Sequence, residues 1–463
     1  MRRLGLITGL MGAGLALACA LPSLAAETAA NVTAAVAAVP VPVAAPAVNS
    51  GDTAWVLVST ALVMLMTIPG LAFFYGGLVR RKNVLSVLMQ CFMIMCLLSL
   101  QWVLFGYSLA FGPDVKGIIG NLSWAGLRSV GADPNAGYAA TIPHSVFMIF
   151  QMMFAVITPA LIIGAFAERM KFSSFCVFIL LWATLVYDPV AHWVWGLGGF
   201  LSRFDAAGNL RAGAADFAGG TVVHVNAGVA ALACALVLGK RKGYPDKMSP
   251  PHNLPFAVLG AALLWFGWFG FNAGSALAAN GLAASAFVVT HIGAASAGLT
   301  WAVIDWLLNK RPTVLGVITG AVAGLVAITP ASGFVNVAGA FGVGIGVAVI
   351  CYIFVSFVKT KAGYDDSLDA FGVHGIGGMW GALATGLWAT AKVNGVNGLF
   401  YGNAGQFLIQ LKAVLITVVF SFAATWILLK IVDAVMGLRA TDQGERIGLD
   451  LSDHRETGYT MLE

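Results

Sequence analysis

Two histidines lie within apolar stretches of this sequence, and each follows an aspartate by eight residues. Asp216 precedes His224 in DFAGGTVVHVNAG, and Asp366 precedes His374 in DDSLDAFGVHGIGG. An imidazole can donate or accept a hydrogen bond and can take up a proton near neutral pH. Ionisable side chains are costly inside a membrane, so each one there suggests a functional site. Neutral imidazoles in an apolar path suit a small solute that both donates and accepts hydrogen bonds and exchanges a proton.

Two other kinds of chemistry fit these histidines less well. A metal site uses three or four donors, whereas the matched acids lie about two helical turns from the histidines. Hydrolysis needs an activated nucleophile beside the histidine, and none is near in the sequence. We therefore expect no metal, no cofactor and no enzymatic activity.

The remaining histidines are expected to have ordinary roles. His291, in VVTHIGAASAG, has no acid at comparable spacing, and we expect it to make a hydrogen bond between helices. The other four lie at the ends of apolar stretches, in loops or in the tail, where we expect solvated or interfacial side chains: His144, His192, His252 and His454.

Aromatic side chains cluster in three further stretches. They close YDPVAHWVWGLGG, stand one helical turn apart in FQMMF, and recur beside a serine in LLWFGWFGFNAGS. Aromatic faces attract a cation by about 0.5–2 kcal/mol each, and a serine hydroxyl can accept its hydrogen bonds. The alternative is a common aromatic belt or simple packing. The candidates are Trp193, Trp195, Phe150, Phe154, Trp268, Phe271 and Ser275.

The elements that position these residues are transmembrane helices. The chain is 59% hydrophobic and only 10% charged, and its mean hydropathy is +0.88, which is typical of an all-α polytopic membrane protein. Apolar stretches long enough to cross a bilayer recur eleven times, at 53–75, 84–111, 141–167, 172–190, 217–239, 254–279, 284–308, 313–330, 334–358, 370–390 and 405–436.

The amino-terminal residues differ from the helical part. Arg2 and Arg3 precede an apolar run and a small-residue site that ends at Ala25, so residues 1–25 are predicted to be a secretory signal peptide. An uncleaved first span is the alternative. Residues 26–52 form an Ala/Pro/Val-rich linker outside the membrane. The helical domain is predicted to cover 53–436, and 437–463 form a cytoplasmic tail.

Basic residues predict the orientation. They gather in alternate loops, which the positive-inside rule assigns to the cytoplasm. With a cleaved signal peptide, the amino terminus lies outside and the carboxyl terminus inside. This distribution also explains the net charge of +5 without a nucleic-acid partner. The residues that carry the argument are Arg80, Arg81, Lys82, Arg169, Lys171, Lys240, Arg241, Lys242, Lys247, Lys310, Arg311, Lys359 and Lys361.

The two Asp-x7-His motifs predict an inverted repeat. They lie 150 residues apart, on predicted spans five and ten, which run in opposite directions. Eight helical residues rise about 12 Å, which puts both histidines near the middle of a core about 30 Å thick. Glycines beside each histidine would let the helices approach closely. Spans 1–5 and 6–10 would form the repeats, with span 11 left over; the alternative is a coincidence of spacing.

Several long motifs resemble the Amt/Mep/Rh ammonium transporter family in its bacterial Amt-type form. They include TIPGLAFFYGGLVRRKNVLS, GAFAERMKF, DFAGGTVVHVNAG, SPPHNLP, WFGFNAGSALAAN and DDSLDAFGVHGIGGMWGALATG, and the resemblance covers about residues 53–460. It implies a homotrimer in which each subunit has its own pore, built from an inverted five-plus-five repeat and a final helix.

The resemblance also assigns roles by position. His224 and His374 match the family's hydrogen-bonded pore histidines. The outer ammonium-binding site corresponds to Trp195, Phe154 and Ser275, and the aromatic gate to Phe154 and Phe271. The supporting residues are Asp216, Phe150, Trp268 and Asp369.

The expected function follows from this resemblance. Ammonium would be recruited at the outer face of the inner membrane and deprotonated, and ammonia would cross a histidine-lined pore, with or without a separately relayed proton. The tail resembles the segment that communicates with PII signal proteins. The alternatives are an ammonium sensor that signals through its tail, and a channel for another small neutral solute such as carbon dioxide.

Overall fold

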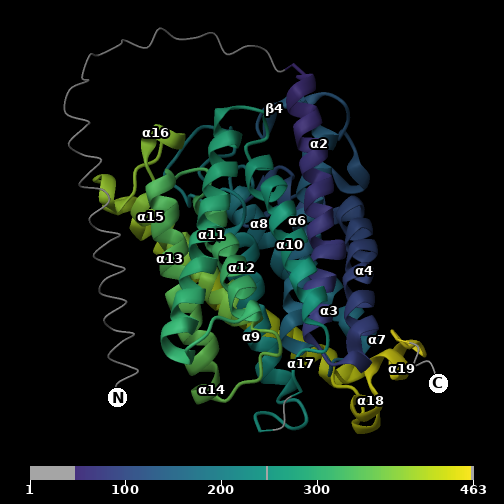
Figure 1. Cartoon of the computed structure of the whole chain (residues 1–463). Coiled ribbons are helices and arrows are strands. Elements are labelled where there is room, and N and C mark those ends of the chain that lie inside the picture. Colours follow the sequence, from purple (N-terminus) through teal and green to yellow (C-terminus); the bar gives the residue numbers. More distant parts are fainter. Residues whose placement is uncertain (1–46, 247–248, 460–463) are drawn as a thin grey trace.

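The computed structural model describes residues 47–246 and 249–459 as a bundle of long helices (Figure 1). Ten helical segments of the described chain are long and apolar enough to cross a membrane. They are Ser50–Leu78, Arg81–Phe111, His144–Phe166, Phe172–Trp195, Gly220–Leu238, Leu254–Ala276, Gly281–Asn309, Val314–Ala331, Val337–Ala362 and Ala404–Met436.

These ten segments match ten of the eleven predicted spans. The remaining prediction, 370–390, corresponds to the helical segments η8 (Phe371–Gly375) and α15 (Ile376–Trp388). That glycine-rich stretch is not among the ten, so the count of eleven is not confirmed. The predicted signal peptide, 1–25, lies outside the described residues, and so does the predicted linker up to residue 46.

The first half of the chain contains the predicted spans one to five. Short π-helical turns interrupt several of them. In chain order the elements are α2 (Ser50–Leu65), η1 (Met66–Leu71), α3 (Ala72–Leu78), η2 (Arg81–Asn83), α4 (Val84–Gln101), η3 (Trp102–Gly106), α5 (Tyr107–Phe111), α6 (His144–Phe166), α7 (Phe172–Trp182), η5 (Ala183–Tyr187), α8 (Asp188–Trp195), η6 (Gly220–Val225) and α9 (Asn226–Leu238).

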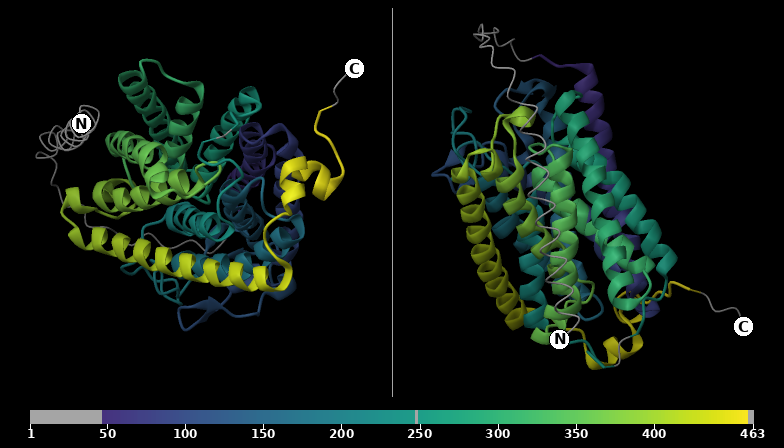
Figure 2. Two further views of the ribbon diagram at one scale, coloured as in Figure 1. Left: turned by 90° about the horizontal axis from the view of Figure 1, so that it is seen from below. Right: turned by 60° about the vertical axis from the view of Figure 1, so that its left-hand side comes forward.

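The second half begins after the loop that contains His252. Its elements before and around the tenth predicted span are α10 (Leu254–Gly274), α11 (Gly281–Asn309), α12 (Val314–Ala331), α13 (Val337–Ile353), η7 (Phe354–Val358), α14 (Lys359–Ala362), η8, α15, α16 (Ala391–Asn394) and η9 (Leu399–Tyr401). The chain then continues through α17 (Ala404–Met436), α18 (Asp442–Ile447) and α19 (Leu449–His454). Figure 2 shows α17 running along one side of the bundle.

One end of the bundle, called the loop end here, carries two small antiparallel ladders. They are β1 (Asp114–Val115) with β2 (Ile119–Gly120), and β3 (Pro134–Asn135) with β4 (Ala139–Pro143). Two histidines expected to be solvated or interfacial are buried here instead. His144 Nε2 lies 2.6 Å from the Tyr107 hydroxyl, and His192 bonds to the carbonyl of Ala110 and the carboxylate of Asp114. Both rings are held by structural hydrogen bonds.

At the opposite end, called the tail end, α18 and α19 lie at one side of the bundle (Figure 1). Polar contacts dock these helices on the beginning of α4. The amide of Leu449 donates to Asn83 Oδ1 at 2.8 Å, and the amide of Ser86 donates to Asp450 Oδ1 at 2.8 Å. The ammonium group of Lys82 donates to the carbonyl of Glu445. The tail is therefore tied to a loop far away in sequence.

A buried ion-pair network joins the loops at the tail end. Arg241 pairs with Asp365 at 2.7 Å and with Glu168 at 3.7 Å, and Arg169 pairs with Asp365 at 2.8 Å. Arg80 pairs with Glu168 at 2.9 Å. Burial raises the pKa of Asp365, but hydrogen bonds and charge attraction from Arg241 and attraction from Arg169 outweigh it, so this pKa is lowered overall. The network fixes four connecting segments against one another.

The segments that carry His224 and His374 cross in close contact, with η6 touching η8 and α15, and α9 touching η8. A Cβ atom at Gly228 would lie 2.0 Å from the backbone nitrogen of Gly375. A Cβ at Gly378 would lie 2.9 Å from the Cβ of His224. The predicted role of these glycines, close approach of two backbones, is confirmed.

We expect Gly228→Ala to destabilise the bundle, because no backbone can accept a carbon atom at 2.0 Å without moving. The cost should be about 1–3 kcal/mol, as for other overpacked sites. Thermal unfolding of the purified protein in detergent would measure it. Gly131→Ala is the matched control, because a Cβ there has no neighbour within 4 Å. Equal unfolding temperatures for the two variants would contradict the packing argument.

Candidate functional site

The two helices that carry the histidines begin inside the bundle, where each is capped by a buried carboxylate. Asp216 accepts hydrogen bonds from the amides of Gly219 and Gly220 at 2.7 Å, Thr221 at 2.8 Å and Val222 at 3.2 Å. These are amides that a helix start leaves without intrahelical partners. The carboxylate thus takes the place of water for the first turn.

The second helix start has the same construction. Asp366 accepts from the amides of Ala370 at 3.0 Å and Phe371 at 2.7 Å. A residue with a left-handed backbone precedes each helical segment: Gly219, directly before η6, has φ of 113°, and Asp369, 150 positions later and two residues before η8, has φ of 60°. This repetition supports the inverted repeat that the sequence predicts, because the two starts match in both cap and backbone.

Both capping acids have raised pKa values. Burial raises the pKa of Asp216, although the amides of Thr221 and Gly219 act in the opposite direction. Burial and the nearby Asp369 raise the pKa of Asp366 to about 6. Both acids are therefore easier to protonate than an exposed aspartate.

The caps change the predicted distance along the chain axis from each acid to its histidine. The chain from Asp216 to Gly219 is not helical, so His224 is the fifth residue of its helical segment and His374 the fourth. The rise from the helix start is therefore about 6 Å to His224 and about 4.5 Å to His374, because the eight residues from each acid are not all helical and do not rise the expected distance of about 12 Å. The acids are also nearly inaccessible to solvent, because Asp216 is 6% exposed and Asp366 is 1% exposed.

The two imidazoles face each other as the spacing predicts. Their ring centroids are 5.4 Å apart and the planes differ by 16°. The hydrogen bond expected between them is absent: within the described part of the chain, both ring nitrogens of His224 and Nδ1 of His374 have no partner. These three nitrogen atoms are available to bind a third group.

A small central cavity lies against both imidazoles. Its volume, measured for the centre of a water-sized molecule, is about 10 Å³, which is roughly room for one such molecule. Apart from the two histidines its lining is apolar or aromatic: Met66, Leu71, Phe74, Ile157, Leu161, Val223, Leu264, Trp268, Phe271 and Val322.

Stacked aromatic rings separate this cavity from the loop end. The rings of Phe154 and Phe271 lie 4.4 Å apart, with an angle of 35° between their planes. Phe150 packs on Phe154 at 5.1 Å, and Trp268 lies 5.5 Å from the His224 ring. All four aromatic side chains are at most 1% exposed. The rings close the direct line between the loop end and the histidines.

A vestibule of about 490 Å³ opens on the other side of these rings and is called the loop-end vestibule. Phe154, Trp195, Asp216 and Ser275 line it. The indole of Trp195 stands edge-on to Phe154 at 5.8 Å and donates to the carbonyl of Asp216 at 2.9 Å. Ser275 donates its hydroxyl proton to the carbonyl of Phe271 at 2.8 Å, so its oxygen lone pairs remain available as acceptors.

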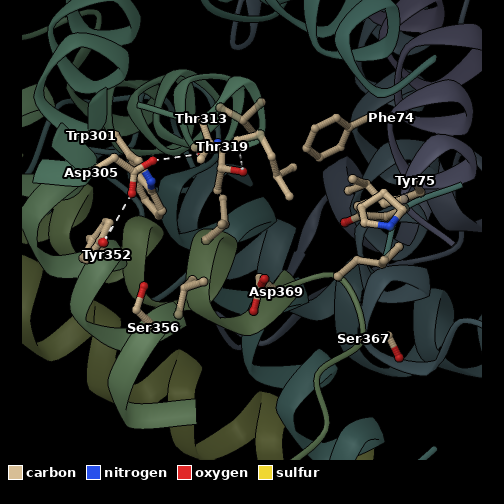
Figure 3. A pocket seen from close by; sticks show the side chains of 18 of the residues that line it. Phe74, Tyr75, Trp301, Asp305, Thr313, Thr319, Tyr352, Ser356, Ser367 and Asp369 are labelled. Atoms are coloured by element: carbon tan, nitrogen blue, oxygen red, sulfur yellow. Dashed lines mark hydrogen bonds between the residues drawn. The ribbon is translucent and has the colours of Figure 1, made fainter. Parts of the chain in front are cut away.

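A third space, the tail-end vestibule of about 390 Å³, begins at His374. His374, Phe74 and Val322 line both this vestibule and the central cavity. Asp369, which the sequence places among the supporting residues, lines the vestibule (Figure 3). It forms an ion pair with Lys359. The two vestibules are thus separated by the aromatic rings, the central cavity and the histidines.

The structure corrects one prediction made from the sequence, and it shows two buried acids that the sequence analysis did not name. Among the residues that the structure describes, His291 makes no hydrogen bond to another helix; the residue is exposed and its ring lies 5.3 Å from that of Trp265. Two buried acids within predicted spans escaped attention, Asp188 and Asp305, which are 0% and 4% exposed. Gln101 donates to Asp188 at 2.8 Å. A search for every ionisable residue in an apolar run would have found both acids.

The fold and the site define a multi-pass helical membrane protein of the small-solute transporter class. A family model described as Ammonium Transporter Family matches residues 54–459. The ammonium transporter of Bacillus subtilis (strain 168) is 54% identical over 411 residues, which are 88% of this chain and 98% of that protein. Ammonium transporter Amt1 of Archaeoglobus fulgidus is 49% identical over 412 residues, which are 89% of this chain and 100% of that protein.

Solved structures agree with this result. The crystal structure of Saccharomyces cerevisiae Mep2 has a TM-score of 0.78 at 35% identity and covers 86% of this chain and 88% of that one. A structure described as a sensor Amt protein has a TM-score of 0.78 at 29% identity and covers 87% of this chain and 98% of that one. The chain belongs to the ammonium transporter family, so it is a transporter and not an enzyme.

Asp216→Asn should lower stability, because the amide group turns N–H donors toward backbone amides that need an acceptor. Leaving buried donors unsatisfied costs roughly 1–3 kcal/mol. Thermal unfolding in detergent measures the effect. Asp205→Asn is the control, since Asp205 bonds only within an exposed loop in the described structure. A loss in Asp205→Asn as large as in Asp216→Asn would refute the capping role.

Proposed function

We propose that the chain recruits ammonium at the loop-end vestibule, deprotonates it there, and conducts ammonia past His224 and His374 to the tail end. The observation that carries this proposal is the central cavity, which has room for roughly one water-sized molecule beside imidazole nitrogens without hydrogen-bond partners. Ammonia both donates and accepts hydrogen bonds, so it suits such nitrogens. Ammonia is about as large as water, so one molecule of it fits the central cavity.

Recruitment of the cation is assigned to Trp195, Phe154 and Ser275. Each aromatic face contributes about 0.5–2 kcal/mol to binding a cation, and the serine oxygen accepts a hydrogen bond that potassium cannot donate. Asp216 lies in the same vestibule, behind the indole that bonds to its carbonyl. We assign it a supporting role, in which it fixes this site and favours loss of the proton.

Selectivity follows from the cost of moving an ion through an apolar cavity. Transfer of an unpaired ion from water to an apolar interior costs many kcal/mol, and the stacked Phe154 and Phe271 rings offer no polar group in its place. Ammonium avoids this cost by leaving its proton behind, whereas potassium has no neutral form. The paired histidines then bind ammonia at the narrowest point, and they are placed to pass on the released proton.

We also propose the orientation that the sequence predicts, with the loop end outside and the tail end in the cytoplasm. Arg80, Arg169, Arg241 and Lys359 all take part in ion pairs at the tail end, which supports it. The inner membrane, a cleaved signal peptide and a homotrimer are proposed on the family resemblance alone. The docked helices α18 and α19 offer a cytoplasmic surface for a PII protein.

The sensor alternative is not favoured. The curated relatives with about half of their residues identical to this chain are named ammonium transporters, whereas the structure described as a sensor is 29% identical. Uptake of radiolabelled methylammonium into cells, with ammonium as competitor, tests transport directly. A pure sensor or a carbon dioxide channel would show no uptake that ammonium inhibits.

Replacing either pore histidine by leucine should cut ammonium flux by roughly tenfold or more, equivalent to about 1.4 kcal/mol of lost stabilisation, or should weaken discrimination against potassium. The physical reason is that leucine can neither bond to ammonia nor take up a proton. Current and flux in proteoliposomes measure both quantities for His224→Leu and His374→Leu. His291→Leu is the control, because that ring is exposed on the side of the bundle. Unchanged flux and selectivity in both pore variants would contradict a role of His224 and His374 in proton transfer.

A further inference from the structure

The tail-end vestibule contains a buried carboxylate that the proposed route does not use. Asp305 lies in the last turns of α11 and is 4% exposed. It accepts hydrogen bonds from the hydroxyl of Thr313 at 2.9 Å and the hydroxyl of Tyr352 at 3.3 Å (Figure 3). It also accepts one from the amide group of Asn309 at 3.1 Å. All three donors are neutral, so the hydrogen bonds leave the negative charge uncompensated.

The other charged side chains of this vestibule already have partners of opposite charge. Asp369 pairs with Lys359, and Arg241 pairs with Asp365 and Glu168. Among the described residues, Asp305 forms no ion pair. A buried carboxylate without a counter-ion is costly. A cation in the vestibule beside Asp305 would therefore be stabilised by this charge.

Two aromatic rings stand beside this carboxylate. Trp301 lies one helical turn before Asp305 on α11, and Tyr352 comes from α13; their ring centroids are 5.2 Å apart at an angle of 63°. Both rings are more than nine-tenths buried and line the vestibule. Figure 3 shows both rings next to Asp305. An aromatic face together with a carboxylate is a favourable setting for a small cation that donates hydrogen bonds.

We propose that Asp305, with Trp301 and Tyr352, forms a second cation site that holds ammonium on the tail side of the pore. His374 lines the same vestibule, so ammonia that leaves the imidazole enters it directly. There the nitrogen lone pair takes a proton from the hydronium ions of the vestibule water, and the charge of the new ammonium ion is balanced by Asp305. This inference rests on the proposed function for the choice of ammonium as the cation.

Asp305 also has a structural role that an experiment must separate from binding. Thr313 caps α12 by accepting a hydrogen bond from the amide of Gly316 at 2.9 Å, and Asp305 accepts from the hydroxyl of the same threonine. Asp305→Asn can keep an oxygen for Thr313, but it removes the charge and turns an N–H group toward Asn309 and Tyr352, which donate to the other oxygen. Thr313→Val removes the cap and keeps the charge. Only the first change should weaken cation binding, whereas the second should lower stability.

Thallium(I), a heavy monovalent cation, tests the site independently of transport. Crystals of the full chain soaked in a thallium salt should show an anomalous peak beside Asp305, which should be lost in Asp305→Asn. Glu456→Gln is the control, because it removes an exposed negative charge at the same end and should keep the peak. A wild-type map without thallium at Asp305 would overturn the proposal, even if the variant cannot be purified.

A transport measurement from each side tests the assignment to ammonium. In everted vesicles, which present the tail end to the medium under the proposed orientation, Asp305→Asn should raise the apparent KM for ammonium roughly tenfold, the change that about 1.4 kcal/mol produces. In right-side-out vesicles KM should not change. Equal KM values for wild type and Asp305→Asn in everted vesicles would reject the site. Normal wild-type flux would then leave the proposed function standing.

Discussion

The structure depends on one constraint, which is that two helices begin inside an apolar bundle and their first amides need acceptors there. The carboxylate of Asp216 accepts four hydrogen bonds from backbone amides at one helix start, and that of Asp366 accepts two at the other. Without them the amides would be buried and unsatisfied. Because each carboxylate fixes its helix start, it also fixes the histidine that follows. The indole of Trp195 bonds to the carbonyl of Asp216, so the same cap positions the loop-end site.

Charged side chains lie near the two ends of the proposed route, and none that the structure describes lines the cavity at its centre. The ion pairs of Glu168, Arg241 and Asp365 are confined to the tail end, and Asp216 lines the loop-end vestibule. Between them the central cavity meets two imidazoles and apolar side chains. Charged groups are therefore present at the two ends, whereas the lining of the central cavity would oppose an ion. A molecule that can lose its charge reversibly has an advantage over one that cannot.

Much of the fold could be predicted from the sequence, because a bilayer requires helices of a minimum apolar length. The histidine pair was also predictable, since matched spacing on opposed helices brings His224 and His374 together. The capping role of the acids was not, because spacing becomes distance only if the intervening residues are helical, and Gly219 and Asp369 are left-handed. The buried state of His144 depends on Tyr107, a partner that one-dimensional spacing does not reveal.

Binding sites at the two vestibules would capture the cation, whereas the cavity between them would select between ammonium and potassium. A site such as the one proposed at Trp195 or at Asp305 would raise the local concentration of ammonium at its own end, but its charge and ring faces would attract potassium as well. The cavity distinguishes them, because only a neutral molecule enters it cheaply. With capture placed at the two ends and discrimination at the centre, either vestibule can gain affinity without loss of selectivity, and the gradient of ammonium and protons decides the direction of flow.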